Sequence, residues 1–112
     1  MRLPGEHMLH TLRDTLLSEV RIDQPDLRLR QLAVLLVAYQ TDELLTVRGL
    51  AKHLRISRPA VSKALDRLEK SDLIRREPDL RDRRSIILGR TEAGMVLIVR
   101  VKAAAADADF RG

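Results

Sequence analysis

Residues 46–71 contain two short helical patterns separated by about three residues, and this spacing constrains the fold more than any other feature. Four apolar residues of the first pattern recur at the interval of one helix face: Val47, Leu50, Ala51 and Leu54. Thr46 is placed to cap this helix, and residues 55–56 form a tight link. The second helix starts after Ser57, a favourable N-cap, with Pro59 in its first turn, where the missing N–H has no cost.

The second helix, predicted over 58–71, divides into two faces when it is drawn at 100° per residue. The apolar face carries Val61, Ala64, Leu65 and Leu68. The opposite face carries Pro59, Ser62, Lys63, Asp66, Arg67 and Lys70. A helix that enters the major groove of DNA needs this division, with an apolar anchor behind short polar and basic side chains. An ordinary surface helix also has a charged outer face, so the pattern alone leaves both interpretations open.

Two runs of β-forming residues follow directly, LIRRE at 73–77 and SIILGR at 85–90. The turn between them, PDLRDRRSI at 78–86, holds three arginines and two aspartates. Taken alone, such mixed charge is typical of a solvated turn. Two helices with a short link, followed at once by a hairpin, instead describe a helix-turn-helix with a wing. In that context we interpret the charged turn as the tip of the wing.

The positive charge of the chain is concentrated in the same region. Residues 46–90 hold 13 Lys and Arg against six Asp and Glu, a balance of +7, whereas the rest holds eight against ten, a balance of −2. A basic segment between slightly acidic ends predicts a polyanion-binding face on a nearly neutral scaffold.

The remaining patterns complete a single domain over 1–112. Helices are predicted at 6–20, 27–40 and 92–109, together with a short strand near Glu43 to Leu45. The run LAVLLVAY in the second of these helices is apolar nearly all round and should form the buried centre of the fold. With only Tyr39 and Phe110 as aromatics, the core must be aliphatic. The expected class is mainly α with a small β-wing, an α+β fold with 27–90 as the winged helix-turn-helix core.

Several other classes of function are disfavoured. The chain has no cysteine, which excludes disulfides, thiolate metal sites and cysteine redox sensing. No run is long and apolar enough for a membrane span, and the start, MRLPGEHMLH, lacks the apolar stretch of a signal peptide, so we expect a cytoplasmic, nucleoid-associated protein. No nucleophile with a base, glycine loop or metal cluster stands out, so neither an enzyme nor a cofactor is expected. His7 and His10 could share a metal, but more simply form an exposed pair.

The ordered fragments ISRPAVSKALDRLEKSDLIRRE, DLRDRRSIIL and TEAG carry a resemblance. The segment from about Leu27 to Gly94, roughly 60% of the chain, resembles the MarR family of bacterial winged-helix transcriptional regulators. The resemblance implies a homodimer that binds double-stranded DNA at a pseudo-palindromic operator. It implies no enzymatic activity and no cofactor.

The resemblance also assigns roles to residues. The helix at 58–71 would read the major groove, and Ser57 would contact a phosphate. In the wing, Asp82 would orient Arg84 into the minor groove, because a narrow groove attracts arginine and a carboxylate can hold its side chain in a bidentate pair. The expected DNA-binding residues are Ser57, Arg58, Pro59, Ser62, Lys63, Arg67, Arg81, Asp82, Arg83 and Arg84.

The ends of the chain depart from the family pattern. About 20 residues follow Thr91, so we expect the final helix of the family to be absent or nearly so, and the helices at 6–20 and 92–109 to form the dimer. The family's effector cleft is partly built from the missing segments, so a small-molecule effector is not expected. Two alternatives stay open: a winged-helix module whose terminal helices bind another protein, and a non-specific architectural DNA binder. Comparing affinity for random and selected DNA separates them.

Overall fold

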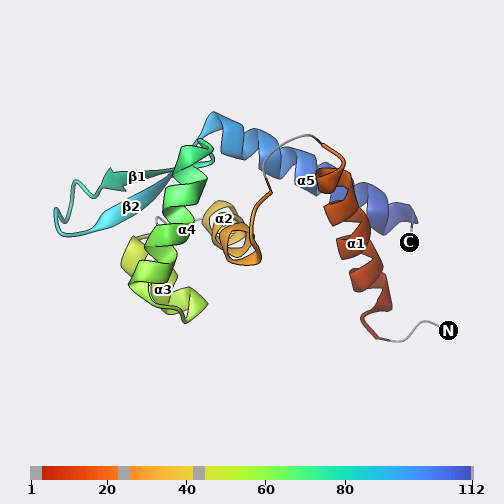
Figure 1. Cartoon of the computed structure of the whole chain (residues 1–112), viewed down its shortest axis with the longest axis horizontal. Helices are drawn as coiled ribbons and strands as arrows, with labels where there is room; N and C mark the ends of the chain where they lie inside the picture. Colours follow the sequence, from red (N-terminus) through yellow and green to blue (C-terminus); the bar gives the residue numbers. More distant parts are fainter. Residues whose placement is uncertain (1–3, 23–25, 42–44, 112) are drawn as a thin grey trace. The chain divides into compact units, whose positions relative to one another are not determined.

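The computed structural model describes residues 4–22, 26–41 and 45–111, and within these residues it contains five helices and one two-stranded antiparallel sheet (Figure 1). In chain order the elements are α1 (Glu6–Val20), α2 (Leu29–Gln40), α3 (Val47–Leu54), α4 (Arg58–Lys70), β1 (Ile74–Pro78), β2 (Ile86–Arg90) and α5 (Glu92–Arg111). The predicted class, mainly α with a small β-wing, is confirmed. The chain divides into two compact units. We call residues 27–96 the winged-helix unit, and residues 1–26 with 97–112 the terminal unit.

The predicted helix starts are confirmed by their caps. The Thr46 hydroxyl accepts a hydrogen bond from the Gly49 N–H at 2.9 Å, at the start of α3. The Ser57 hydroxyl accepts one from the Ala60 N–H at 3.2 Å, at the start of α4. These bonds satisfy N–H groups that have no partner within the helix, which is why hydroxyl residues fix where each helix begins.

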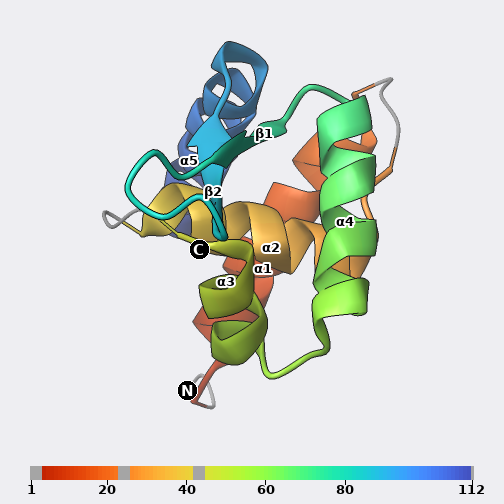
Figure 2. The same cartoon turned by 90° about the vertical axis from the view of Figure 1, so that its left-hand side faces the viewer.

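The core of the winged-helix unit is aliphatic. Its fully buried side chains come from α2, α3, α4 and β1: Val34, Leu35, Leu50, Val61, Leu65, Leu68 and Ile74. Leu65 and Leu68 belong to the apolar face predicted for α4, and Val34 and Leu35 to the helix predicted as the buried centre, so both predictions are confirmed. Burial of each such side chain stabilises the fold by about 1.5 to 3 kcal/mol. Both α2 and α3 pack against α4, with α2 lying behind α4 in Figure 2.

The strands of the hairpin begin one residue later than predicted. Ile74 pairs with Arg90 at one end of the ladder, and Pro78 pairs with Ile86 at the other. The short strand expected near Glu43 to Leu45 falls mostly on residues 42–44, which lie outside the described residues. At their edge, the Leu45 carbonyl accepts a hydrogen bond from the Leu88 N–H at 2.9 Å, and Thr46 forms a β-bridge with Ile87.

A buried hydrogen-bond cluster anchors the first turn of α5. The Tyr39 hydroxyl donates to the Leu73 carbonyl at 2.6 Å and accepts from the Thr91 N–H at 3.1 Å. The Thr91 hydroxyl caps α5: it accepts from the Gly94 N–H at 2.9 Å and donates to the Asp72 carbonyl at 2.6 Å. A Cβ atom at Gly94 would overlap the Tyr39 hydroxyl and the Leu73 carbonyl oxygen. Only glycine therefore fits this close approach.

One arginine of β1 connects the hairpin to α4. The Arg76 guanidinium donates to the carboxylates of Asp66 and Glu69. The planar guanidinium fork of this half-buried strand residue reaches both carboxylates at once. Burial opposes the charged form of Arg76, but its hydrogen bonds to both carboxylates and their negative charges together outweigh burial, and the pKa of Arg76 lies above its ordinary value.

The terminal unit contains its own link between helices. Arg100 of α5 donates from Nε and Nη2 to the two carboxylate oxygens of Glu19 in α1, at 2.8 and 2.9 Å. These hydrogen bonds, against a smaller effect of burial, raise the pKa of Arg100 above its ordinary value. A bidentate pair fixes orientation as well as distance, so it ties α1 to the C-terminal part of α5.

Replacing Gly94 tests the anchor of α5. We expect Gly94→Ala to lower the free energy of unfolding by about 2 to 4 kcal/mol, because the new methyl group must displace the Tyr39 hydroxyl and break its hydrogen bonds. Urea denaturation measures this loss. In a double-mutant cycle, Tyr39→Phe with Gly94→Ala should cost less than the sum of the single variants, since removing the hydroxyl opens space for the methyl group. A loss below 0.5 kcal/mol for Gly94→Ala, well under the roughly 1 kcal/mol floor for overpacking, would contradict the anchor.

Replacing Arg76 tests the link between the hairpin and α4. We expect Arg76→Met to lower the free energy of unfolding by about 1 to 2 kcal/mol, since two carboxylates lose their partner at a partly buried site. Arg75→Met is the matched control. The Arg75 side chain lies on the other face of the same strand and is 61% exposed, with Glu77 at 3.5 Å and the Arg90 carbonyl, to which it donates, at 3.3 Å. We expect a change within about 0.5 kcal/mol for the control, and equal losses in the two variants would refute the role of Arg76.

Candidate nucleic-acid interface

The start of α4 is an exposed, positively polarised surface. Ser57, Arg58 and Pro59 are all exposed there. The first-turn N–H groups of a helix point away from its body, and with the helix dipole they attract anions. Arg58 adds a full positive charge at this end and forms no ion pair with any described residue. The position is chemically suited to a phosphate group.

The outward face of α4 carries the remaining predicted residues of the helix. Lys63 is exposed and makes no ion pair among the described residues, while Ser62 is half-buried. Arg67 is turned toward the end of its own helix, where its guanidinium donates to the Ser71 hydroxyl. Asp66 is engaged by Arg76, as described above. Two basic groups of this face therefore remain exposed, Lys63 near the start of α4 and Lys70 at its end.

Two aspartates shape the loop between β1 and β2 through hydrogen bonds to the backbone. Asp79 Oδ1 accepts from the Arg81 N–H at 2.9 Å, and Asp82 Oδ1 accepts from the Arg84 N–H at 3.0 Å. Asp82 Oδ2 also accepts from the Ser85 hydroxyl at 3.2 Å. Each aspartate thus forms a turn with the residue two positions ahead, which is a preferred conformation for this residue type.

The structure corrects the predicted action of Asp82. Its carboxylate was expected to hold the Arg84 guanidinium in a bidentate pair, but it accepts from the Arg84 backbone instead. A side chain with a single methylene group reaches the N–H two residues ahead more easily than the far end of an arginine. As a result Arg81, Arg83 and Arg84 are all exposed, and none forms an ion pair with another described residue.

The two groups of basic residues belong to the same compact unit. The hairpin and α4 lie side by side, joined by the ion pairs of Arg76 (Figure 2). Period two along β1 places Arg76 on the same side of the strand as the buried Ile74. This alternation was the signal in the sequence that could have identified Arg76 as a residue that faces α4. The Tyr39 anchor had no such signal, because it depends on contacts between distant segments.

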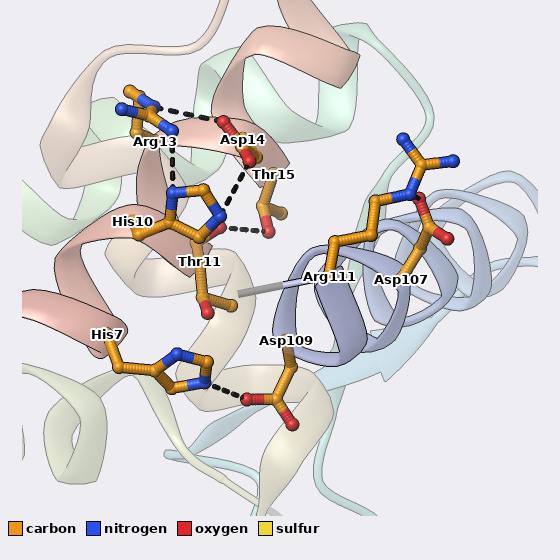
Figure 3. A network of polar contacts seen from close by, with 9 residues as sticks. All are labelled: His7, His10, Thr11, Arg13, Asp14, Thr15, Asp107, Asp109 and Arg111. Atoms are coloured by element: carbon orange, nitrogen blue, oxygen red, sulfur yellow. Dashed lines mark hydrogen bonds and ion pairs between the residues drawn. The ribbon is translucent and has the colours of Figure 1, made fainter.

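The histidines of α1 do not form a metal site in the structure. His7 contacts Asp109, and His10 lies 3.2 Å from Asp14 (Figure 3). A hydrogen bond from the Arg13 guanidinium lowers the pKa of Asp14. In residues 4–22, 26–41 and 45–111, no group of three or more His, Asp or Glu side chains is arranged to hold a metal ion. None of the helices in these ranges has the length and apolar character that a membrane crossing requires.

Comparisons with known proteins agree with this geometry. The model of the MarR family matches residues 27–86, which span the helix-turn-helix and most of the hairpin. The MepR–DNA complex of S. aureus is similar at a TM-score of 0.71 and 26% identity, over 92% of this chain and 79% of that one. YusO from Bacillus subtilis is similar at a TM-score of 0.69 and 25% identity, over 96% and 70%. A comparison with curated proteins gave no match.

The family match covers more than half of the chain, and it lies on the unit that carries both basic surfaces. The order of helices and strands in this unit is the one that the sequence resemblance implied. The chain belongs to the MarR family.

Proposed function

We propose that the protein is a sequence-specific transcription regulator that binds double-stranded DNA as a homodimer at a pseudo-palindromic operator. It is a regulator rather than an enzyme, and it acts at the nucleoid. The proposal is carried by one observation: a single compact unit holds both the exposed basic start of α4 and a loop whose three exposed arginines form no ion pair with another described residue. The similarity to MepR, which was solved in complex with DNA, supports the same conclusion.

Recognition of bases is assigned to α4. The start of α4 approaches the DNA backbone through Ser57, Arg58 and Pro59. Ser62 and Lys63 come next, on the outward face of the helix. Short polar and basic side chains of this kind contact base edges and phosphates in the major groove, which is wide enough for a helix. Arg67 lies farther along the same face and contacts DNA only if its hydrogen bond to Ser71 opens.

The loop of the hairpin is assigned to the minor groove. Arg84 enters the groove, where the negative potential is concentrated, and Arg81 and Arg83 contact phosphates or the groove edge. Asp82 positions Arg84 through the backbone, because its carboxylate fixes the Arg84 N–H. A loop shaped before DNA arrives loses less conformational entropy on binding.

The homodimer is assigned to α1 and α5. Large apolar side chains stand exposed on both helices: Met8, Leu9, Leu12, Leu16, Val20, Met95, Val96, Val99 and Phe110. In a single chain this is an unusual amount of apolar surface, which a second copy would remove from water. Two copies related by a two-fold axis also match the symmetry of a pseudo-palindromic operator.

Replacing Arg84 tests the minor-groove contact. We expect Arg84→Ala to weaken binding to a selected operator by about 1 to 3 kcal/mol, that is, about 5- to 150-fold, because a desolvated arginine in the groove is lost. A gel-shift titration at fixed salt measures the change. Arg111→Ala removes the same charge from the terminal unit and should bind like the parent protein. The wing assignment fails if Arg84→Ala and Arg83→Ala both bind with unchanged affinity.

Replacing Val99 tests the homodimer. Val99 is 66% exposed in the single chain, so Val99→Glu should leave the protomer folded. We expect the parent to sediment at twice its 12.7 kDa, and Val99→Glu to shift the mass toward one copy, since a carboxylate does not tolerate an apolar interface. Arg13→Glu, on the charged side of α1, should remain dimeric. A parent that sediments as a single copy at micromolar concentration would overturn this assignment.

A further inference from the structure

We propose that α3 carries a second DNA-backbone contact, made by Arg48, Lys52 and Arg55. We call these three residues the α3 basic stripe. The inference rests on the proposed DNA binding and goes beyond it, because neither the recognition helix nor the wing includes these residues. Its chemical target is the phosphate backbone beside the groove that α4 enters, not the edges of the bases.

The three residues follow one another along α3 and its C-terminal cap. Arg48 and Lys52 occupy positions i and i+4 of the helix, which places them on the same side, Arg55 is the cap residue directly after the helix, and all three are exposed. Leu50 and Ala51 of the same helix are buried. None of the three side chains forms an ion pair or hydrogen bond with another described residue.

The charge around the stripe is uncompensated over a long stretch. From 45 to 65 the sequence contains no Asp or Glu, while it holds Arg48, Lys52, Arg55, Arg58 and Lys63. A helix pair of this length would normally carry charges of both signs on its exposed surfaces. A continuous basic surface across α3, the link and the start of α4 is the footprint of a polyanion.

Arg55 occupies its position at a cost to the fold. Its backbone is left-handed, with φ 57° and ψ 41°, a conformation that glycine or asparagine adopts with little strain and that a long side chain disfavours. The bonds that close the helix here join the Arg55 N–H to the Lys52 carbonyl and the Ile56 N–H to the Ala51 carbonyl, at 3.3 and 3.2 Å. Both are backbone bonds that glycine would keep, so the side chain contributes nothing to this cap.

Arg48 is also placed against a local preference. It lies in the first turn of α3, where the positive end of the helix dipole disfavours a cation, and that turn contains no acidic residue. The unfavourable positions of Arg48 and Arg55 are explained if the α3 basic stripe has a role other than stabilising the fold. Sequences depart from local structural preferences mainly at functional sites.

The position of the stripe fits a backbone contact. Arg55 lies two residues before Ser57, the N-cap of α4, so the stripe ends where α4 begins (Figure 2). In a helix-turn-helix the first helix crosses the DNA backbone while the second enters the groove. The α3 basic stripe would therefore meet phosphates next to those contacted by Ser57 and Arg58.

A change at Arg55 should separate stability from DNA binding. Arg55→Gly removes both the strain and the charge, so its thermal midpoint should equal or exceed that of the parent while its affinity for DNA falls. We expect a loss of about fivefold for each protomer at 0.15 M salt, equal on operator and random duplex. The slope of log K against log salt should shrink by about one for each protomer.

A matched control exists in the same chain. Asp72 has the same φ of 57° and is exposed, but it follows α4 at the far end from Ser57. Asp72→Gly should also keep or raise the thermal midpoint, without any loss of DNA affinity. Arg55→Lys should keep most of the affinity and salt slope, and Arg55→Asn, which tolerates the left-handed backbone, should lose both as Arg55→Gly does.

The outcomes distinguish this inference from the proposed function. If the parent binds no duplex at all, the proposed function fails, whatever the variants do. If the parent binds DNA and Arg55→Gly and Arg55→Asn bind with the same affinity and salt slope, the α3 contact is overturned. A fall in affinity for the two variants, with no fall for Asp72→Gly, supports it.

Discussion

Burial of one face of α4 is the constraint on which the proposed interface depends. Val61, Ala64, Leu65 and Leu68 pack into the aliphatic core, and this packing fixes how the helix is rotated. Because the four apolar residues are buried on one side of α4, the polar and basic residues between them face outward. Arg76 extends the same constraint to the hairpin, because its two ion pairs hold β1 against α4. A rigid scaffold of this kind can present a helix and a loop to two grooves at once.

Local signals made most of the fold predictable from the sequence. The caps at Thr46 and Ser57 gave correct helix starts, since a hydroxyl accepting a first-turn N–H depends only on nearby residues. Helical periodicity separated the two faces of α4 for the same reason. In the candidate site, these signals located both basic segments but not their hydrogen-bond partners.

Some features could not be predicted from the sequence. They depend on contacts between segments far apart in the chain, or on competition between neighbouring hydrogen-bond partners. Tyr39 meets Leu73 and Gly94 only after the chain has folded, so no local pattern marks that cluster. The Asp82 carboxylate was expected to pair with the Arg84 side chain, but the Arg84 backbone N–H competes for the same carboxylate and lies nearer. The left-handed backbone at Arg55 could not be predicted either, because an arginine in the sequence gives no indication of this conformation.

We propose that two copies of the winged-helix unit read DNA through α4 and the hairpin loop. A hydroxyl-radical footprint on a duplex that the protein has selected from a random library tests it most directly. We predict two symmetric protected half-sites centred about 34 Å apart, one turn of the double helix, or a near multiple of it, with minor-groove protection from the hairpin loops. Failure to enrich any sequence, or uniform protection along the duplex, would contradict the account.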